Sequence, residues 1–477
     1  MSRYDVLIRG GTMVTASGTI ESDMAISDEV IAVLEPDIEG SAKTEINASH
    51  LHIFPGLVDA HVHLCEPGRT HWEGFASGSR AFAAGGATTI FDMPLNAYPP
   101  TNDKASFDLK LAAAKESASI DFALWGGLVP GNVDRLEELA ECGVVGFKAF
   151  MASSIEDFQD VDDLTLYEGM TEAARLGLPV AVHAESNPIV GRLTQRALAR
   201  VRVSARDYSD SRPVIAELEA ISRALLFAEE TGCTLHIVHV SSGRGVELVA
   251  AARARGVDAS CETCAHYLAL TEEDLVMLGP IAKCAPPLRT REEQDALWDH
   301  ILEGRLPMVT SDHSPCPPDM KAGDDYFRAW GGISGGQSTM QVLLTAGSER
   351  GASLPSVASL TSQASAWRFG LSRKGRIEVG SDADLMLVDI TQSEVLEAED
   401  LFYRHKHSPY VGKELKGRIV HTLLRGTPVF SEGKIVSGPR GQLIKPNKPP
   451  SRSPDYGVLS EPISQIPEGR KQRVEKG

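Results

Sequence analysis

Residues 143–185 contain the three segments that decide the fold: GVVGFKAF (143–150), LTLYEGMTEAARLG (164–177) and LPVAVHAE (178–185). The first and third are short apolar runs, which are typical of buried strands. The middle segment has the apolar spacing of an amphipathic helix. A strand, a helix and a second strand in this order predict a βαβ unit with parallel strands.

The same unit repeats along the middle of the chain, where DRLEELAEC and AELEAISRALLFAEETG are further helical patterns between short apolar runs. Eight alternations over roughly 250 residues are the signature of a (β/α)₈ TIM-like barrel. An open doubly wound sheet is the alternative, but the strand count favours the barrel. The predicted strands are Gly56–Leu64, Ala87–Met93, Asp121–Leu128, Val144–Phe150, Pro179–Glu185, Thr234–Val240, Asp258–Cys264 and Pro307–His313.

Both ends of the chain have β-rich patterns. The first fifty or so residues, and later GSDADLMLVDI and GRIVHTLLRGTPVFSEGKIV, alternate apolar and polar positions between turn residues, which predicts antiparallel strands. We therefore expect an α/β fold in which residues 1–54 and 376–445 form one small β-sandwich domain beside a barrel at 55–375. The Pro-, Ser- and charge-rich segment 446–477 predicts an extended tail.

The composition excludes several classes of partner. A net charge of −18 argues against nucleic acid or an anionic membrane as the main partner. The N-terminus lacks the apolar core of a secretory signal, and no apolar stretch is long enough to span a bilayer. Seven cysteines, an odd number spread along the chain, indicate reduced thiols rather than disulfides. These features predict a cytoplasmic protein.

Metal-capable side chains recur near the C-terminal ends of the predicted strands, where barrel active sites assemble. His61 and His63 are two positions apart on the first strand, so both imidazoles lie on the same face. Four imidazoles and one carboxylate suit zinc or another borderline divalent ion. The sequence thus predicts a metal centre at the barrel mouth, built from His61, His63, Lys148, His183, His239 and Asp312.

Lys148 does not fit a metal site as an ammonium ion, because an ammonium repels a cation. One interpretation is a lysine paired with a nearby carboxylate. The other is that its neutral amine has reacted with CO₂, because the resulting carbamate is an anion whose two oxygens can bridge two metal ions. Burial or a nearby cation lowers a lysine pKa and makes the neutral amine available.

Five segments together resemble the cyclic amidohydrolases, the family of dihydroorotases, hydantoinases and allantoinases: DAHVHLCEPGRTHWEG, GFKAF, VAVHAE, LHIVHVSS and SDHSPC. The resemblance covers nearly the whole chain. Six segments are most similar to the allantoinase branch, and hydantoinases and dihydroorotases do not share them: EPGRTHWEG, RDYSDSRPVIAE, KCAPPLR, SDHSPCPPDMKAG, AWGGISGGQS and YRHKHSPYVG. One departure is CAHY, which has Ala265 where allantoinases have proline.

This resemblance implies roles for the six residues. His61, His63 and Asp312 would bind the more buried of two divalent ions, His183 and His239 the more exposed one, and carbamylated Lys148 (N6-carboxylysine) would bridge both. Zinc is expected, with cobalt, manganese, iron and nickel as alternatives. A hydroxide shared by the two ions would attack the ring amide of allantoin and give allantoate, with Asp312 as general base and then acid. Relatives are often homotetramers, so we expect one here.

Four residues are candidates for substrate contact. Asn96 follows the second strand, and Cys284 and Gly332, with Gly331 beside it, match segments that line the cleft in relatives. Dihydroorotases carry an arginine soon after the His-x-His pair, whereas this chain has Cys65 at that point, which argues against dihydroorotate. Arg69, slightly further on, is the fourth candidate.

Two alternatives remain open. A hydantoinase or dihydropyrimidinase-type cyclic amidase is the runner-up, and the HWEG and SDHSPCPPDMKAG segments argue against it. Non-catalytic assembly proteins with this fold have lost metal ligands, whereas all six are present here.

Several polar residues near the strand ends have simpler interpretations. We expect Cys261 and Cys264 to be packing residues, and His266 either to face the barrel mouth or to make a structural hydrogen bond. We expect Asp59 and His313 to support the site from behind the ligands.

Overall fold

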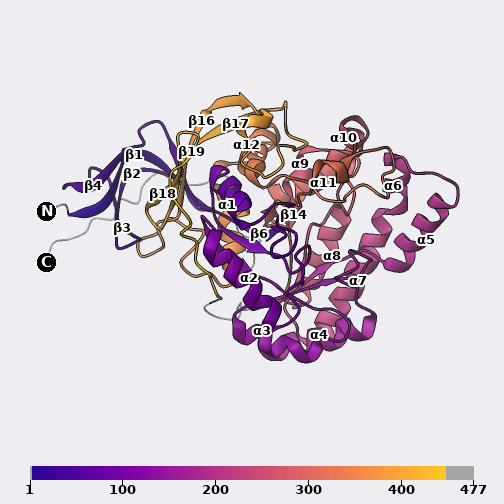
Figure 1. Cartoon of the computed structure of the whole chain (residues 1–477). Coiled ribbons are helices and arrows are strands. Elements are labelled where there is room, and N and C mark those ends of the chain that lie inside the picture. The colour runs from indigo at the N-terminus through magenta and orange to yellow at the C-terminus, as the bar shows by residue number, and fades with distance from the viewer. Residues whose placement is uncertain (1–2, 447–477) are drawn as a thin grey trace.

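Eight parallel strands form a closed barrel in the computed structural model, which describes residues 3–446 (Figure 1). All neighbouring strands pair in parallel, and a parallel bridge between Val62 and His313 joins the last strand to the first. Each strand lies within its predicted range, so the barrel is confirmed over the open sheet. The strands are β6 (Leu57–Val62), β7 (Ala87–Asp92), β8 (Asp121–Leu124) with β9 (Gly126–Gly127), β10 (Phe147–Phe150), β11 (Val180–His183), β12 (Leu235–Ile237), β13 (Ala259–Cys261) with β14 (Thr263–Cys264), and β15 (Val309–Thr310).

Helices follow the strands and surround the barrel (Figure 1). The three segments with the clearest amphipathic spacing are all helical, as predicted. The helices are α1 (Phe75–Ala84), α2 (Lys104–Ser117), α3 (Leu136–Cys142), α4 (Asp163–Leu176), α5 (Asn187–Leu198), α6 (Ala205–Ser211), α7 (Val214–Thr231), α8 (Gly243–Ala254), α9 (Ala265–Ala269), α10 (Glu272–Leu278), α11 (Arg291–Leu302), α12 (Thr339–Arg350), α13 (Leu354–Ala358) and α14 (Ala364–Arg368).

Helix α4 illustrates how the local sequence sets the ends of an element. The side chain of Asp162 accepts a hydrogen bond from the backbone N–H of Thr165, which satisfies one free donor of the first turn. Gly177 ends the helix in a left-handed conformation with φ of 69°, which costs glycine little because it has no Cβ. Asp162 and Gly177 therefore set where the helix begins and ends, and the chain then continues into β11.

Strands from both chain ends form one small β domain, as expected. Its nine-stranded sheet includes an antiparallel pairing of β5 with β16, and inward-facing side chains of both ends share a core that includes Ile8, Ile53 and Leu387. The strands are β1 (Tyr4–Thr15), β2 (Gly18–Ser27), β3 (Val30–Glu35), β4 (Ala42–Asn47), β5 (His52–Pro55), β16 (Leu385–Val395), β17 (Glu414–Leu424), β18 (Thr427–Ser431) and β19 (Lys434–Ile435).

The expectation of antiparallel strands in this domain is confirmed for six strand pairs and wrong for two. Strands β4 and β5 both pair with β1 in parallel, so the sheet is mixed. Alternation of apolar residues shows that one face of a strand is buried, but it does not show the direction of the neighbouring strand. We retain 1–54, 55–375 and 376–445 as a proposed domain division. The predicted tail at 446–477 lies, except for its first residue, outside the described residues.

A buried group of charges joins the barrel to the β domain. The Nζ atom of Lys374 lies 2.6 Å from a carboxylate oxygen of Asp121, at the start of β8, and 2.7 Å from one of Asp384, just before β16. Arg425, which follows β17, also pairs with Asp121. Burial disfavours the charge of Lys374, but the three neighbouring aspartates outweigh this and raise its pKa. The group therefore depends on each charge having its partner.

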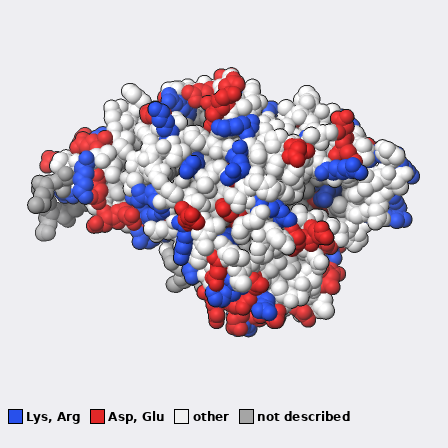
Figure 2. Space-filling model, viewed as in Figure 1, with Lys and Arg blue, Asp and Glu red and all other residues white. Residues whose placement is uncertain are grey.

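The surface carries charges of both signs. Lys and Arg side chains are interspersed with Asp and Glu across the face shown in Figure 2, in keeping with a net charge that argues against a polyanionic partner. Within residues 3–446, no helix has both the length and the apolar character needed to cross a membrane.

Replacing Lys374 with methionine would remove the cation that Asp121 and Asp384 share and leave Asp121 with Arg425 alone. We expect Lys374→Met to lower the free energy of unfolding by about 3–5 kcal/mol, as measured by urea denaturation. The control is Lys43→Met, because Lys43 forms a similarly short pair with Asp5 on the exposed surface. Equal effects of the two substitutions would contradict the stabilising role of the buried group.

Candidate metal centre

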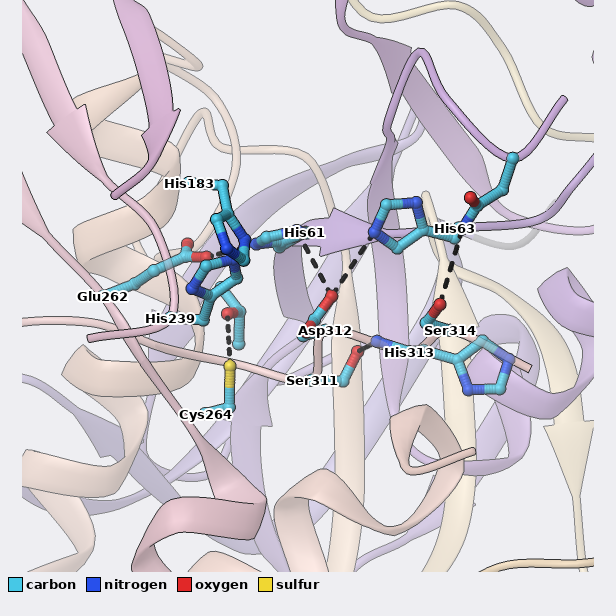
Figure 3. A network of polar contacts seen from close by, with 12 residues as sticks. His61, His63, His183, His239, Glu262, Cys264, Ser311, Asp312, His313 and Ser314 are labelled. Carbon is cyan, nitrogen blue, oxygen red and sulfur yellow. Dashed lines mark hydrogen bonds and ion pairs between the residues drawn. The ribbon is translucent and has the colours of Figure 1, made fainter. Parts of the chain in front are cut away.

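Three predicted ligands meet at the mouth of the barrel. The Nε2 atoms of His61 and His63 each lie 3.3 Å from Oδ1 of Asp312, and all three side chains are buried (Figure 3). Ligand atoms of the three residues lie within 4.8 Å of one another. His61 and His63 come from the end of β6 and Asp312 from the end of β15, which are neighbours because the barrel closes there. Two nitrogens and one oxygen around a common point suit a divalent metal ion.

Two more predicted ligands lie beside this group. Nδ1 of His183, at the end of β11, is 2.9 Å from Nε2 of His239, which follows β12. The rings of His239 and His61 are 5.4 Å apart, so the second pair adjoins the first group. Burial lowers the pKa of both His183 and His239. Both imidazoles are therefore neutral at neutral pH, as metal ligation requires.

Lys148, on β10, completes the predicted set. Its Nζ atom is buried and makes no hydrogen bond within the described part of the chain. Burial lowers the pKa of Lys148 to about 7, even though Asp312 and Glu262 act in the opposite direction. Its strand pairs with β11, which carries His183, and its Nζ atom lies 5.0 Å from the ring centre of Phe150, which stacks on the His183 ring. A buried amine without an acceptor, beside neutral imidazoles, fits a carbamate better than an ammonium ion.

Glu262 supports His61 from behind and was not identified in the sequence. One oxygen of Glu262 lies 2.6 Å from Nδ1 of His61 and the other lies 3.1 Å from Nε2 of His236. Burial acts to raise the pKa of Glu262, but the two histidines outweigh it and lower the pKa to about 2. The carboxylate therefore holds the proton of His61 on Nδ1 and leaves Nε2 free to bind a metal. Glu262 lies between Cys261 and Thr263 in SCETCAH, so on a strand its side chain points to the opposite face from theirs. This was the only feature of the sequence that could have indicated its role.

Glu185 has the same relation to His183. Its Oε2 atom lies 2.7 Å from Nε2 of His183 and also pairs with Arg212. Burial acts to raise the pKa of Glu185, but Arg212 and His183 lower it to about 2, so the carboxylate is ionised. The proton of His183 is thereby held on Nε2, which leaves Nδ1 facing His239. The spacing His-x-Glu on one strand face could have indicated this pair.

Asp59 fastens the two strands that carry the first three ligands. Its carboxylate accepts hydrogen bonds from the backbone N–H groups of His61, at 3.2 Å, and Ser311, at 3.1 Å. Asp312 follows directly with φ of 43°, and His239 has φ of 40°, which non-glycine residues rarely adopt. Strain of this kind costs about 1–3 kcal/mol and concentrates at functional sites.

The remaining polar residues near the strand ends are not part of the cluster of His61, His63 and Asp312. The ring of His313 lies between Phe82 and Tyr403, pointing away from Asp312, so His313 supports His63 only through its backbone carbonyl (Figure 3). Cys261 and Cys264 are free and buried, in keeping with a packing role. His266 is buried and its ring hydrogen-bonds the backbone of Ser311, in keeping with the expected structural role, while its Nε2 has no partner among the described residues.

A cavity of about 450 Å³ opens beside the ligands. Among the predicted substrate contacts, Asn96 lines it and donates from Nδ2 to the Ser314 hydroxyl at 3.4 Å. Gly331 also lines it. The same cavity is also lined by five predicted ligands: His61, His63, His183, His239 and Asp312.

Three predicted contacts are not among the lining residues. Arg69 pairs with Asp157, Cys284 is buried with its carbonyl accepting from Tyr208 at 2.9 Å, and Gly332 packs on Ser314. A Cβ on Gly332 would lie 2.4 Å from the carbonyl oxygen of Ser314, so its role is close packing. The positions of Arg69, Cys284 and Gly332 depend on the conformation of their loops, which the sequence pattern does not predict.

Comparison with known proteins assigns this architecture to a known group. Residues 52–429 match the model of the amidohydrolase family. An allantoinase from Rubrobacter xylanophilus is 60% identical over 450 residues, which cover 94% of this chain and 99% of that protein. An allantoinase from Escherichia coli O1:K1 / APEC is 46% identical over 448 residues, covering 92% and 98%.

Solved structures give the same result for the fold. The L-hydantoinase (dihydropyrimidinase) from Arthrobacter aurescens superimposes with a TM-score of 0.90 and 35% identity, over 93% of this chain and 100% of that chain. The barrel with a small β domain is thus an arrangement that this chain shares with a cyclic amidase.

Glu262 offers a test of the support behind the ligands. We expect Glu262→Gln to weaken metal binding about 10- to 100-fold, because the neutral amide no longer fixes the proton of His61. Competition with a metal-binding dye measures this affinity. The matched control is Glu73→Gln, since Glu73 is equally buried but accepts from Arg404 rather than from a ligand. Wild-type affinity in Glu262→Gln would show that this carboxylate does not orient His61.

Proposed function

The chain belongs to the amidohydrolase family, and we propose that it hydrolyses a cyclic amide bond of allantoin to give allantoate. The observation that carries this proposal is the buried cluster of His61, His63 and Asp312 in a chain that most resembles allantoinases along nearly its whole length. The cluster supplies the chemistry, and the resemblance supplies the substrate.

Two divalent metal ions are part of the proposal, with zinc favoured by the imidazole-rich ligand set. Cobalt, manganese, iron and nickel remain alternatives. His61, His63 and Asp312 would hold one ion, His183 and His239 the other, and the carbamate of Lys148 both. The unpartnered buried amine of Lys148 supports the modification by CO₂. When bound, such ions polarise a carbonyl and lower the pKa of water towards about 7.

Asp312 is the residue that moves the proton in this proposal. Burial acts to raise its pKa, but His61 and His63 outweigh this and lower it, so the carboxylate is ionised at neutral pH. It accepts the proton of the attacking water and delivers it to the leaving ring nitrogen. Asn96 lines the cavity and positions the substrate, while direct contacts from Arg69, Cys284 and Gly332 stay predictions.

A hydantoinase of the dihydropyrimidinase type is the second candidate, because the overall fold matches the solved L-hydantoinase closely. Identity to that protein is 35%, whereas it is 60% to the Rubrobacter xylanophilus allantoinase, which favours allantoin. The third candidate, a non-catalytic assembly protein, has less support because all six ligand residues are present. A homotetramer in the cytoplasm completes the proposal.

A substrate comparison tests the assignment. Metal-loaded enzyme is offered allantoin, hydantoin, dihydrouracil and dihydroorotate under identical conditions, and ring opening is followed for each. We expect kcat/KM for allantoin to exceed the other values by about 100-fold or more, because a site that hydrogen-bonds a polar group of its substrate discriminates against analogues that lack the group. Faster turnover of hydantoin or dihydrouracil would replace the proposal with the second candidate.

The bridging role of Lys148 has its own test. We expect Lys148→Ala to lose most bound metal and activity, because no other side chain supplies the bridging anion. Acetate or propionate added at high concentration should restore part of both by taking the place of the carbamate. Metal content is measured directly, and the wild-type enzyme with the same acids is the control. Full activity in Lys148→Ala without added acid would exclude a bridging carbamate.

A further inference from the structure

The segments that separate this chain from hydantoinases in sequence lie together on one wall of the cavity. RDYSDSRPVIAE contributes Tyr208 and Arg212, KCAPPLR contributes Lys283, and AWGGISGGQS contributes Trp330 and Gly331. Hydantoinases share the predicted metal ligands but not these segments. The lining of the cavity therefore combines the predicted metal ligands with residues of these segments.

Direct contacts join these segments. The Nζ atom of Lys283 lies 4.5 Å from the ring centre of Tyr208, and the guanidinium carbon of Arg212 lies 5.6 Å from it. Lys321, from SDHSPCPPDMKAG, donates to the carbonyl of Lys283 at 3.2 Å and to that of Trp330 at 3.0 Å. The wall is thus one packed unit whose two cations flank a tyrosine.

Lys283 has hydrogen-bond donors to spare. It is only 5% exposed, and its Nζ atom donates to the carbonyl of Ala329 at 2.5 Å. Within residues 3–446, no carboxylate lies close enough to Lys283 to form an ion pair. An ammonium has three N–H donors and a neutral amine has two, so in either form Lys283 has capacity for an acceptor in the cavity. Burial, together with the charges of Lys321 and Arg212, lowers the pKa of Lys283 to about 7.

Arg212 lies next to Lys283 and is connected to a predicted ligand through Glu185. One nitrogen of its guanidinium pairs with Glu185, which accepts from His183, so Arg212 is two contacts away from a predicted ligand. Its side chain remains 15% exposed, and it has five N–H donors in a rigid fork. Asp312, at the metal centre, is the only acidic residue in the described lining. The wall therefore offers donors without a competing carboxylate.

We infer that Arg212 and Lys283 form a subsite that binds the carbonyl oxygen of the ureido arm of the substrate. This inference rests on the proposed function, because allantoin is a hydantoin ring that carries a ureido group. With the ring amide at the metal centre, the arm extends along the wall and its carbonyl accepts from both cations. An unsubstituted hydantoin ring has no group to fill this subsite, so its binding does not depend on it.

Lys283→Met tests the subsite, because methionine keeps the length of the side chain and removes its donors. We expect kcat/KM for allantoin to fall about 10- to 100-fold, the loss that follows removal of a hydrogen bond from a charged donor. The dissociation constant of hydantoin, measured by calorimetry on the metal-loaded protein and as competitive inhibition of allantoin turnover, should change less than about twofold. Arg212→Lys keeps the ion pair with Glu185 but loses the fork, and it should show the same selective loss.

Arg328→Met is the matched control, since Arg328 lines the mouth of the same cavity but its side chain is 89% exposed. It removes one positive charge at the rim and should leave both constants nearly unchanged. Equal losses for allantoin and hydantoin in Lys283→Met, or no loss for either, would overturn the subsite. Absence of allantoin turnover by the wild-type enzyme would instead refute the proposed function, so the two failures are distinct.

Discussion

The contact between the first and last strands of the barrel is the constraint on which the site depends. The backbone N–H of Ser311 donates to Asp59 across 252 positions of sequence, and the same carboxylate accepts from the N–H of His61. The N–H of His63 donates to the carbonyl of His313 at 2.8 Å. These bonds bring Asp312 to the two histidines. Without closure, β6 and β15 would lie at opposite edges of an open sheet, and the cluster would not form.

Carboxylates behind the ligands decide which nitrogen of each imidazole faces the centre. Glu262 leaves Nε2 of His61 free, whereas Glu185 leaves Nδ1 of His183 free. His61 and His183 therefore present different ring nitrogens to the proposed centre, which they approach from β6 and β11. Burial alone would make the histidines neutral, but it would not choose the tautomer. The tautomer is set by the ionised carboxylates of Glu262 and Glu185, whose charge is stabilised by histidines and, for Glu185, by Arg212.

The barrel and the clustering of His61, His63 and Asp312 could be predicted from the sequence because both follow from simple periodicities. Each strand is a short apolar run, and its last residues must lie at the same end of the barrel. Residues in loops could not be placed this way. Arg69 pairs with Asp157, and Cys284 is buried, because loop conformation depends on contacts between distant segments. Glu262 could not be predicted because its partner His61 is far away in sequence. The strand directions in the β domain could not be predicted because alternation of apolar residues does not depend on them.

The single residue between β5 and β6 has a consequence for how the molecule is made. Gly56 connects a strand of the small sheet directly to the first ligand-bearing strand, and its donor bonds to Asp384 at 2.8 Å. Strand β5 pairs with residues 385–388, which a ribosome synthesises only after every ligand residue. During synthesis one edge of β5 therefore stays open and can pair wrongly with other chains. A nascent chain that stops before residue 385 carries all six predicted ligands, but β5, which leads into its first barrel strand, lacks its pairing with β16.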